Sequence, residues 1–216
     1  MTNLRLLIAD DHAVVRAGLR ALLESRKGWQ VCAEAADGRD AVEKATKHKP
    51  DVIILDIGMP LLNGVEAARR IRKALPQSEI LILTMHESDE LVQQVVEAGA
   101  RGYILKDEAD RVLHAAIDAL RQHKPYFSTR VSQAADAADA GGDGDSGRTS
   151  RSRLTPRERE ILQLLAEGKS NKEVATLLNI SVNTAEAHRA NIMLKLDFHS
   201  LADLVMYAVR NKIIRT

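Results

Sequence analysis

Five polar or charged side chains in the first half of the chain each follow a short apolar run. They are three carboxylates, one hydroxyl and one ammonium: Asp10, Asp11, Asp56, Thr84 and Lys106. Clustered carboxylates repel one another, and a hard divalent cation with oxygen ligands relieves that repulsion. A carboxylate can attack phosphorus while the cation and an ammonium neutralise the phosphoryl oxygens. Brought together, these residue types predict an aspartyl phosphorylation site.

The apolar runs before these residues predict buried strands. They are continuously apolar, which is typical of a parallel sheet covered by helices on both faces. Segments with helical spacing alternate with them, so five strands and five helices are expected. The carboxyl ends of parallel strands face one crevice, and the five side chains would meet there. The expected strands include Leu4–Ala9, Val52–Leu55, Ile80–Leu83 and Tyr103–Leu105, and the expected helices include Asp40–His48, Gly64–Ala74, Asp89–Glu97 and Asp110–Arg121.

Each residue also has a plain structural explanation when it is considered alone. Asp11 is expected to help cap the following helix. Asp56 fits a turn, Thr84 a strand end and Lys106 a solvated surface charge. Only their joint position at four strand ends favours a reactive site, because reactive groups cluster in such places.

The acidic pair, the motif Leu-Asp-Ile-Gly-Met-Pro around Asp56, and the later residues Gly64, Thr84 and Lys106 resemble the receiver domain of bacterial two-component response regulators. The match covers about the first 120 residues. It implies a flavodoxin-like (βα)5 fold with a parallel sheet of order 2-1-3-4-5. It also implies that a sensor histidine kinase phosphorylates Asp56.

The resemblance implies a role for each remaining site residue. Asp10, Asp11, Asp56 and the backbone carbonyl of Gly58 would hold Mg²⁺. Thr84 would bind the product phosphoryl group together with Lys106. As Thr84 moves inward, the ring of Tyr103 would enter the space it leaves, although core packing explains Tyr103 nearly as well.

Two enzyme classes are disfavoured by the residues after the first and third strands. Hydrolases of the haloacid-dehalogenase type need a second Asp two residues after the nucleophile, where this chain has Gly58. Dinucleotide-dependent oxidoreductases need Gly-x-Gly-x-x-Gly after the first strand, where Asp-Asp-His-Ala-Val-Val stands. We therefore expect no enzyme. A receiver that is never phosphorylated and serves as a constitutive scaffold remains the alternative.

Composition indicates a cytoplasmic protein that does not insert into a membrane. The 216 residues are 45% hydrophobic and 28% charged, and no apolar run approaches the roughly 20 residues of a membrane span. The first residues show no secretory signal. Cys32 is the only cysteine, which suits a reducing compartment.

The chain is predicted to form two domains joined by a flexible linker. Residues 132–150 read SQAADAADAGGDGDSGRTS and contain no large apolar residue, although a short helix over Ala134–Ala140 is an alternative. The excess of basic over acidic residues is −1 in residues 1–125 and +5 in residues 148–216, so the second part favours a polyanion. We predict a receiver at 1–122, a linker at 123–149 and a second domain at 150–216.

Residues 150–214 predict four helices that include a helix-turn-helix. Thr155, Pro156 and Glu158 form a strong helix start, and this helix ends at Gly168. A short helix over Asn171–Leu178 and a longer one over Val182–Leu196 are joined by a tight turn, as in a helix-turn-helix that enters the major groove. A last helix runs from Ser200 to about Asn211.

This part resembles the LuxR-type helix-turn-helix of the NarL/FixJ subfamily, through Leu-Thr-Pro-Arg-Glu-Arg-Glu, Ala-Glu-Gly-Lys-Ser-Asn-Lys-Glu-Val-Ala and the run that begins at Thr184. Promoter DNA is the expected partner. Helical geometry predicts one face that reads bases and an adjoining stripe that reaches phosphates. The first comprises Asn183, Glu186, Ala187 and Ala190, and the second Thr184, His188, Asn191 and Lys195, assisted by Lys172 and Arg189.

A single domain of this size would bind DNA weakly, and paired domains on two half-sites overcome this. By resemblance, the last helix, Leu201–Val209, makes the dimer contact. Phosphorylation is expected to release this helix from the receiver. We therefore expect a homodimer when Asp56 is phosphorylated.

Overall fold

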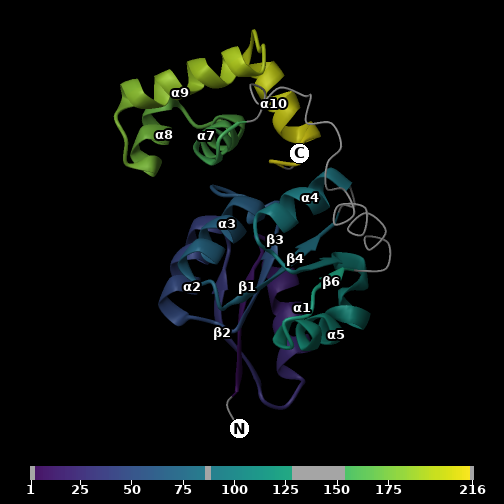
Figure 1. Cartoon of the computed structure of the whole chain (residues 1–216). Helices are drawn as coiled ribbons and strands as arrows, with labels where there is room; N and C mark the ends of the chain where they lie inside the picture. Colours follow the sequence, from purple (N-terminus) through teal and green to yellow (C-terminus); the bar gives the residue numbers. More distant parts are fainter. Residues whose placement is uncertain (1–2, 86–88, 128–153, 215–216) are drawn as a thin grey trace. The chain divides into compact units, whose positions relative to one another are not determined.

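The computed structural model describes residues 3–85, 89–127 and 154–214. The chain divides into two compact units, residues 1–142 and 143–216, which are described separately (Figure 1). The region predicted as a linker between residues 132 and 150, and the alternative helix within it, lie outside the described residues. None of the described helices has the length and hydropathy needed to cross a membrane.

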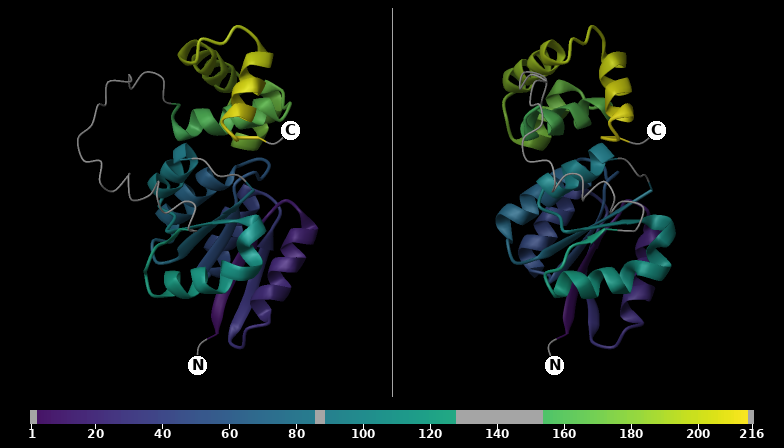
Figure 2. Two further views of the ribbon diagram at one scale, coloured as in Figure 1. Left: turned by 90° about the vertical axis from the view of Figure 1, so that its right-hand side faces the viewer. Right: turned by 45° about the vertical axis from the view of Figure 1, so that its right-hand side comes forward.

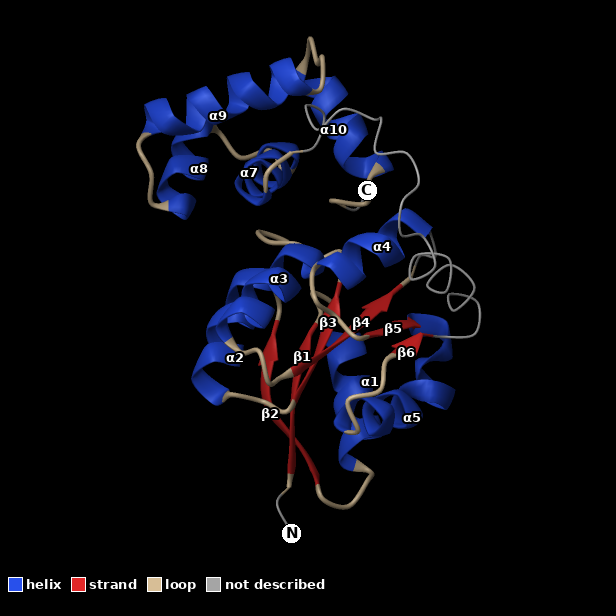
Figure 3. Cartoon of the chain, in the orientation of Figure 1, coloured by secondary structure: helices blue, strands red, loops and turns tan. Residues whose placement is uncertain are grey.

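The first unit is a parallel sheet with helices on both faces (Figure 3). Its strand order is β2-β1-β3-β4-β5-β6, which confirms the predicted order 2-1-3-4-5 and adds one strand. The strands are β1 (Leu4–Ala9), β2 (Trp29–Ala35), β3 (Val52–Asp56), β4 (Glu79–Thr84), β5 (Gly102–Leu105) and β6 (Tyr126–Phe127), and the helices are α1 (Ala13–Glu24), α2 (Gly38–His48), α3 (Gly64–Ala74), α4 (Asp89–Glu97), the 3-10 turn η1 (Lys106–Glu108) and α5 (Ala109–Arg121).

The sixth strand corrects the start of the predicted linker. Tyr126 and Phe127 fall within the segment 123–149, yet they pair with Gly102 and Tyr103 of β5. The two rings pack against the cores on opposite faces of the sheet, as successive strand residues do. Aromatic burial on both faces therefore ties this short segment to the receiver sheet.

Two apolar layers hold the sheet. Residues of α2, α3 and α4 cover one face, and α1 and α5 cover the other (Figures 1 and 2). Within β1, Leu7 and Ala9 face the first layer, whereas Leu6 and Ile8 face the second. Burial on both faces explains why the strand sequences are apolar without alternation.

The second unit contains four helices among its described residues: α7 (Pro156–Ala166), α8 (Asn171–Leu178), α9 (Val182–Lys195) and α10 (Leu201–Arg210). Serine or threonine caps each amino terminus. Thr155, Ser170 and Ser200 form reciprocal capping boxes, and Ser181 accepts from Thr184 N–H. Asn179 has a φ of 50° and ends α8, which allows the tight turn into α9. The predicted helices are therefore confirmed, with end points that differ by at most two residues.

Gly64 begins α3 where the chain leaves no room for a side chain. A Cβ there would overlap the carbonyl oxygen of Asp56. We expect Gly64→Ala to lower the free energy of unfolding of the receiver by about 1–3 kcal/mol, as overpacking does. Chemical denaturation followed by the fluorescence of Trp29, the only tryptophan, measures this.

Gly18 provides the matched control. It lies within α1 with nothing inside 4 Å of an added Cβ. Gly18→Ala should stabilise the receiver by roughly 0.5–1 kcal/mol, because alanine favours helix over glycine. Equal effects of both substitutions would contradict the steric explanation for Gly64.

Candidate functional site

The register of the sheet brings the predicted site residues together. Ala9 pairs with Leu55, so the next residues, Asp10 and Asp56, lie beside each other at the carboxyl edge. Thr84 pairs with Leu105 at the same edge, and Lys106 follows directly. All four positions come from strand ends that are remote in the sequence.

Burial separates these residues into two groups. Asp10 and Asp56 are fully buried and Thr84 is 3% exposed. Asp11 is exposed, and Gly58 lies half-buried in the loop after β3. At this edge of the sheet the carboxylates of Asp10 and Asp56 are therefore buried, whereas that of Asp11 is open to solvent.

The Lys106 ammonium contacts both buried carboxylates. Its Nζ lies 2.5 Å from Asp10 Oδ2 and 3.1 Å from Asp56 Oδ2. Two buried carboxylates would otherwise repel each other at a high desolvation cost. Lys106 is thus a counter-ion shared by the two carboxylates that sequence reasoning had grouped with it.

Two residues of the site were missed by sequence reasoning. Arg16 donates from Nη1 to the main-chain oxygen of Asp10 at 2.7 Å, while its Nε lies 3.5 Å from Glu34 Oε2. The main-chain N–H of His12 donates a hydrogen bond to Asp10 Oδ1 at 2.8 Å. His12, rather than Asp11, is the N-cap residue of α1, so the capping role expected for Asp11 was wrong. Proximity of both residues to the acidic pair was the available signal.

The donor set suits a hard divalent cation. Asp10, Asp11, His12 and Asp56 each offer one ligand atom, and these atoms all lie within 4.8 Å of one another. Carboxylate oxygens are the ligands that such cations prefer. The receiver therefore carries an acidic pocket of the kind that binds a metal ion.

Tyr103 lies fully buried in β5, with its ring in the same core layer as Ile82, its pairing partner on β4. Thr84 ends that neighbouring strand. The two residues predicted to act as a switch are thus on adjacent strands, and the Tyr103 ring is buried between core residues.

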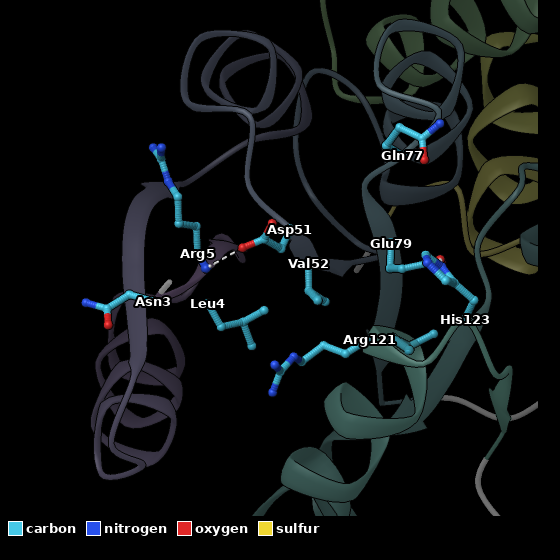
Figure 4. Close-up of a pocket in the computed structure, with 10 residues that line it drawn as sticks. Asn3, Leu4, Arg5, Asp51, Val52, Gln77, Glu79, Arg121 and His123 are labelled. Atoms are coloured by element: carbon cyan, nitrogen blue, oxygen red, sulfur yellow. Dashed lines mark hydrogen bonds and ion pairs between the residues drawn. The ribbon is translucent and has the colours of Figure 1, made fainter. Parts of the chain in front are cut away.

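A cavity of about 510 Å³ lies at the opposite, amino-terminal edge of the sheet (Figure 4). Its two lining carboxylates already have partners. Asp51 Oδ2 accepts the N–H of Arg5 at 2.8 Å, and Glu79 Oε1 lies 2.7 Å from His123 Nδ1. The clustered carboxylates of the acidic pocket belong to the other edge.

Most of the predicted DNA-binding residues of α9 lie on its exposed surface. Its inner face is buried through Ala185 and Ile192. His188 and Arg189 are half-buried, and Lys172 lies exposed on α8. Thr184 Oγ1 lies 2.8 Å from Ser181 Oγ at the helix cap. The remaining members of the predicted set are exposed: Asn183, Glu186, Ala187, Ala190 and Asn191.

Lys195 differs from the rest of the predicted DNA-binding set. Its Nζ donates to both carboxylate oxygens of Glu158 at 2.7 and 2.8 Å. The same helix α7 carries Arg157, which pairs with Glu160 at 2.8 Å and donates to the carbonyl of Leu178 at 3.0 Å. The Arg157–Leu178 and Lys195–Glu158 contacts join α7 to the ends of α8 and α9.

Burial by itself raises the pKa of the Glu158 carboxyl, but hydrogen bonds from Lys195 and Thr155 outweigh burial and hold this pKa below its usual 4.5. A lowered pKa gives stability that is present above the unfolded pKa and is lost as the pH falls through the folded pKa. We therefore expect α7 to lose protection in the acid range, as the pH falls below the usual pKa of 4.5.

Hydrogen exchange of peptides from residues 156–166, compared between the native chain and Glu158→Gln, measures this effect. The substituted chain should show a weaker pH dependence over that range. The same acid response in both chains would refute the role of Glu158.

Comparisons with known proteins agree with both units. Residues 6–118 match the response regulator receiver domain, and residues 152–208 match the luxR family of bacterial regulatory proteins. The chain is 39% identical over 215 residues to the oxygen regulatory protein NreC of Staphylococcus haemolyticus, covering 98% of this chain and 99% of that protein.

Solved structures give the same result. A LuxR-family response regulator from Aurantimonas sp. has a TM-score of 0.60 and 34% identity, covering 65% of this chain and all of that chain. RcsB of Salmonella enterica serovar Typhimurium, bound to promoter rprA in the presence of phosphomimetic BeF3−, has a TM-score of 0.62 and 28% identity, covering 95% of this chain and 98% of that chain. This chain belongs to the two-component response regulators that join a receiver domain to a LuxR-type DNA-binding domain, the NarL/FixJ subfamily.

Proposed function

We propose that Asp56 accepts a phosphoryl group from the phosphohistidine of a sensor kinase and that this modification controls promoter binding by the second unit. The observation that carries the proposal is the shared contact of Lys106 with the buried carboxylates Asp10 and Asp56. Promoter DNA lies in the cytoplasm, so we place the function there.

The transfer requires a nucleophilic carboxylate oxygen and a neutralised phosphoryl group. An oxygen of Asp56 forms the new bond to phosphorus while the phosphorus–nitrogen bond of phosphohistidine breaks and the imidazole leaves, taking up a proton. Lys106 would turn from carboxylate to phosphoryl oxygen as charge develops there.

Asp10, Asp11, Asp56 and the backbone carbonyl of Gly58 would hold Mg²⁺. The ion, when bound, supplies charge neutralisation at the phosphoryl oxygens. Carboxylate ligands fit this ion, and Arg16 would keep Asp10 in position by its hydrogen bond to the Asp10 carbonyl.

We further propose that Thr84 donates a hydrogen bond to the phosphoryl group on Asp56. Thr84 and Tyr103 are on paired strands, so a shift of the β4 end changes the space beside the Tyr103 ring. The buried ring of Tyr103 would then stabilise the position of the β4 end that forms when Asp56 is phosphorylated.

The exposed surface of α9 is the proposed base-reading face. Asn183, Glu186, Ala187 and Ala190 would meet base edges, and Thr184, His188 and Asn191 would lie along the phosphates. Lys172 and Arg189 would add phosphate contacts. Lys195 would serve the fold, because Glu158 already binds its ammonium.

A receiver that acts as a constitutive scaffold remains the competing hypothesis. Incubation with acetyl phosphate and Mg²⁺ should raise the intact mass of the native chain by one phosphoryl group and leave Asp56→Asn unchanged. Asp107→Asn, which removes an exposed carboxylate next to Lys106, is the matched control and should react as the native chain does. A native chain that stays unmodified by both acetyl phosphate and a histidine kinase would favour the scaffold.

Phosphorylation should convert monomers to dimers through α10. Leu201 and Met206 are 46% and 52% exposed on this helix, which leaves apolar surface for a partner. Sedimentation with acetyl phosphate and Mg²⁺ should show a doubled mass for the native chain and a monomer for Met206→Glu. An unchanged native mass would refute the dimer.

Loss of Lys172 and Arg189 should weaken DNA binding without changing sequence preference, because phosphate contacts carry no sequence information. The slope of log affinity against log salt is negative, and its magnitude should decrease by about 0.9 for each lost phosphate contact. Binding titrations at several salt concentrations measure it for Lys172→Ala/Arg189→Ala. The control Lys47→Ala/Lys73→Ala removes two exposed receiver cations and should leave the slope unchanged.

A further inference from the structure

The imidazole of His12 lies against two carboxylates of the acidic pocket. Its Nδ1 is 2.8 Å from Asp11 Oδ1 and 3.2 Å from Asp10 Oδ1. The side chain is 54% exposed, so an ion from solvent can reach it. The pocket therefore offers a nitrogen atom as a metal ligand in addition to its carboxylate oxygens.

The spacing of these three atoms fits neighbouring ligands of one ion. In an octahedral site with bonds of about 2.1 Å, adjacent ligand atoms are about 3.0 Å apart. The two distances from His12 Nδ1, which are hydrogen-bond and ion-pair contacts when no ion is bound, lie on either side of that value. Asp56 completes a four-residue set whose ligand atoms lie within 4.8 Å of one another.

The surrounding contacts keep this arrangement in place. The N–H of His12 donates to Asp10 Oδ1, the carboxylate oxygen that faces the imidazole. Lys106 contacts the other oxygen, Oδ2. Its charge repels every divalent ion alike, so it does not select among them.

We propose that His12 is a nitrogen ligand through which this pocket binds late first-row divalent ions, such as Ni²⁺, Co²⁺ and Zn²⁺, in competition with Mg²⁺. The inference rests on the proposed function, because the same carboxylates would hold Mg²⁺. Imidazole suits these ions and their affinities exceed those of harder ions at nitrogen sites, whereas Mg²⁺ prefers oxygen.

Calorimetric titration of the full chain, without a histidine tag, tests this. Ni²⁺ should bind the native chain and be displaced only by a large excess of Mg²⁺. His12→Asn and His12→Ala should each weaken Ni²⁺ binding by at least about tenfold. Their Mg²⁺ affinity should change by less than about twofold, because that ion does not need the imidazole.

His199→Asn is the matched control. His199 is exposed and its Nε2 lies 3.8 Å from Asp197 Oδ1; it is not part of the candidate metal-binding group found among the described residues. This substitution should leave Ni²⁺ affinity unchanged. Absorption of bound Co²⁺ gives a second readout, since loss of a nitrogen ligand shifts its visible bands.

Three results would overturn the inference: no Ni²⁺ binding by the native chain, undiminished Ni²⁺ binding by both His12 variants, or an equal loss of Ni²⁺ and Mg²⁺ affinity. The third would give His12 a purely structural role. Failure of the proposed function is seen separately, as absence of Mg²⁺-dependent phosphorylation of the native chain.

Discussion

Two buried carboxylates, Asp10 and Asp56, stand side by side at one edge of the receiver sheet, and this repulsive pair constrains the residues around it. Burial of like charges is costly unless an opposite charge shares the site. Lys106 supplies that charge from the end of β5, across the sheet from β1. The pocket thus forms only when strands from four parts of the chain have assembled in register.

The same register couples chemistry to packing. Thr84 and Lys106 lie at the ends of neighbouring strands, and Tyr103 lies within one of them. A change in charge at Asp56 therefore takes place close to Tyr103 and the core layer that α2, α3 and α4 cover. In the second unit, α7 has a comparable positioning role, because Glu158 and Arg157 bind groups at the ends of α9 and α8.

Local patterns predicted elements well where one strong signal was present. The reciprocal capping pair of Thr155 and Glu158 formed as expected, and the apolar runs became strands. Prediction failed where the partner was distant in sequence. Tyr126 and Phe127 look like the start of a linker until β5 is beside them. The ion pair of Lys195 with Glu158, 37 residues earlier, was likewise not predicted, although Lys195 was expected to contact DNA phosphates.

The sequence by itself determined the parallel fold, the acidic and basic residues at the strand ends and the helix-turn-helix, because these depend on local periodicity, capping and residue type. Only the tertiary structure decided which charges pair, that Arg16 and His12 join the acidic pocket, and that a sixth strand extends the sheet beyond β5. Such features depend on distances of a few ångströms between segments far apart in the chain. Spacing along a sequence contains no direct measure of those distances.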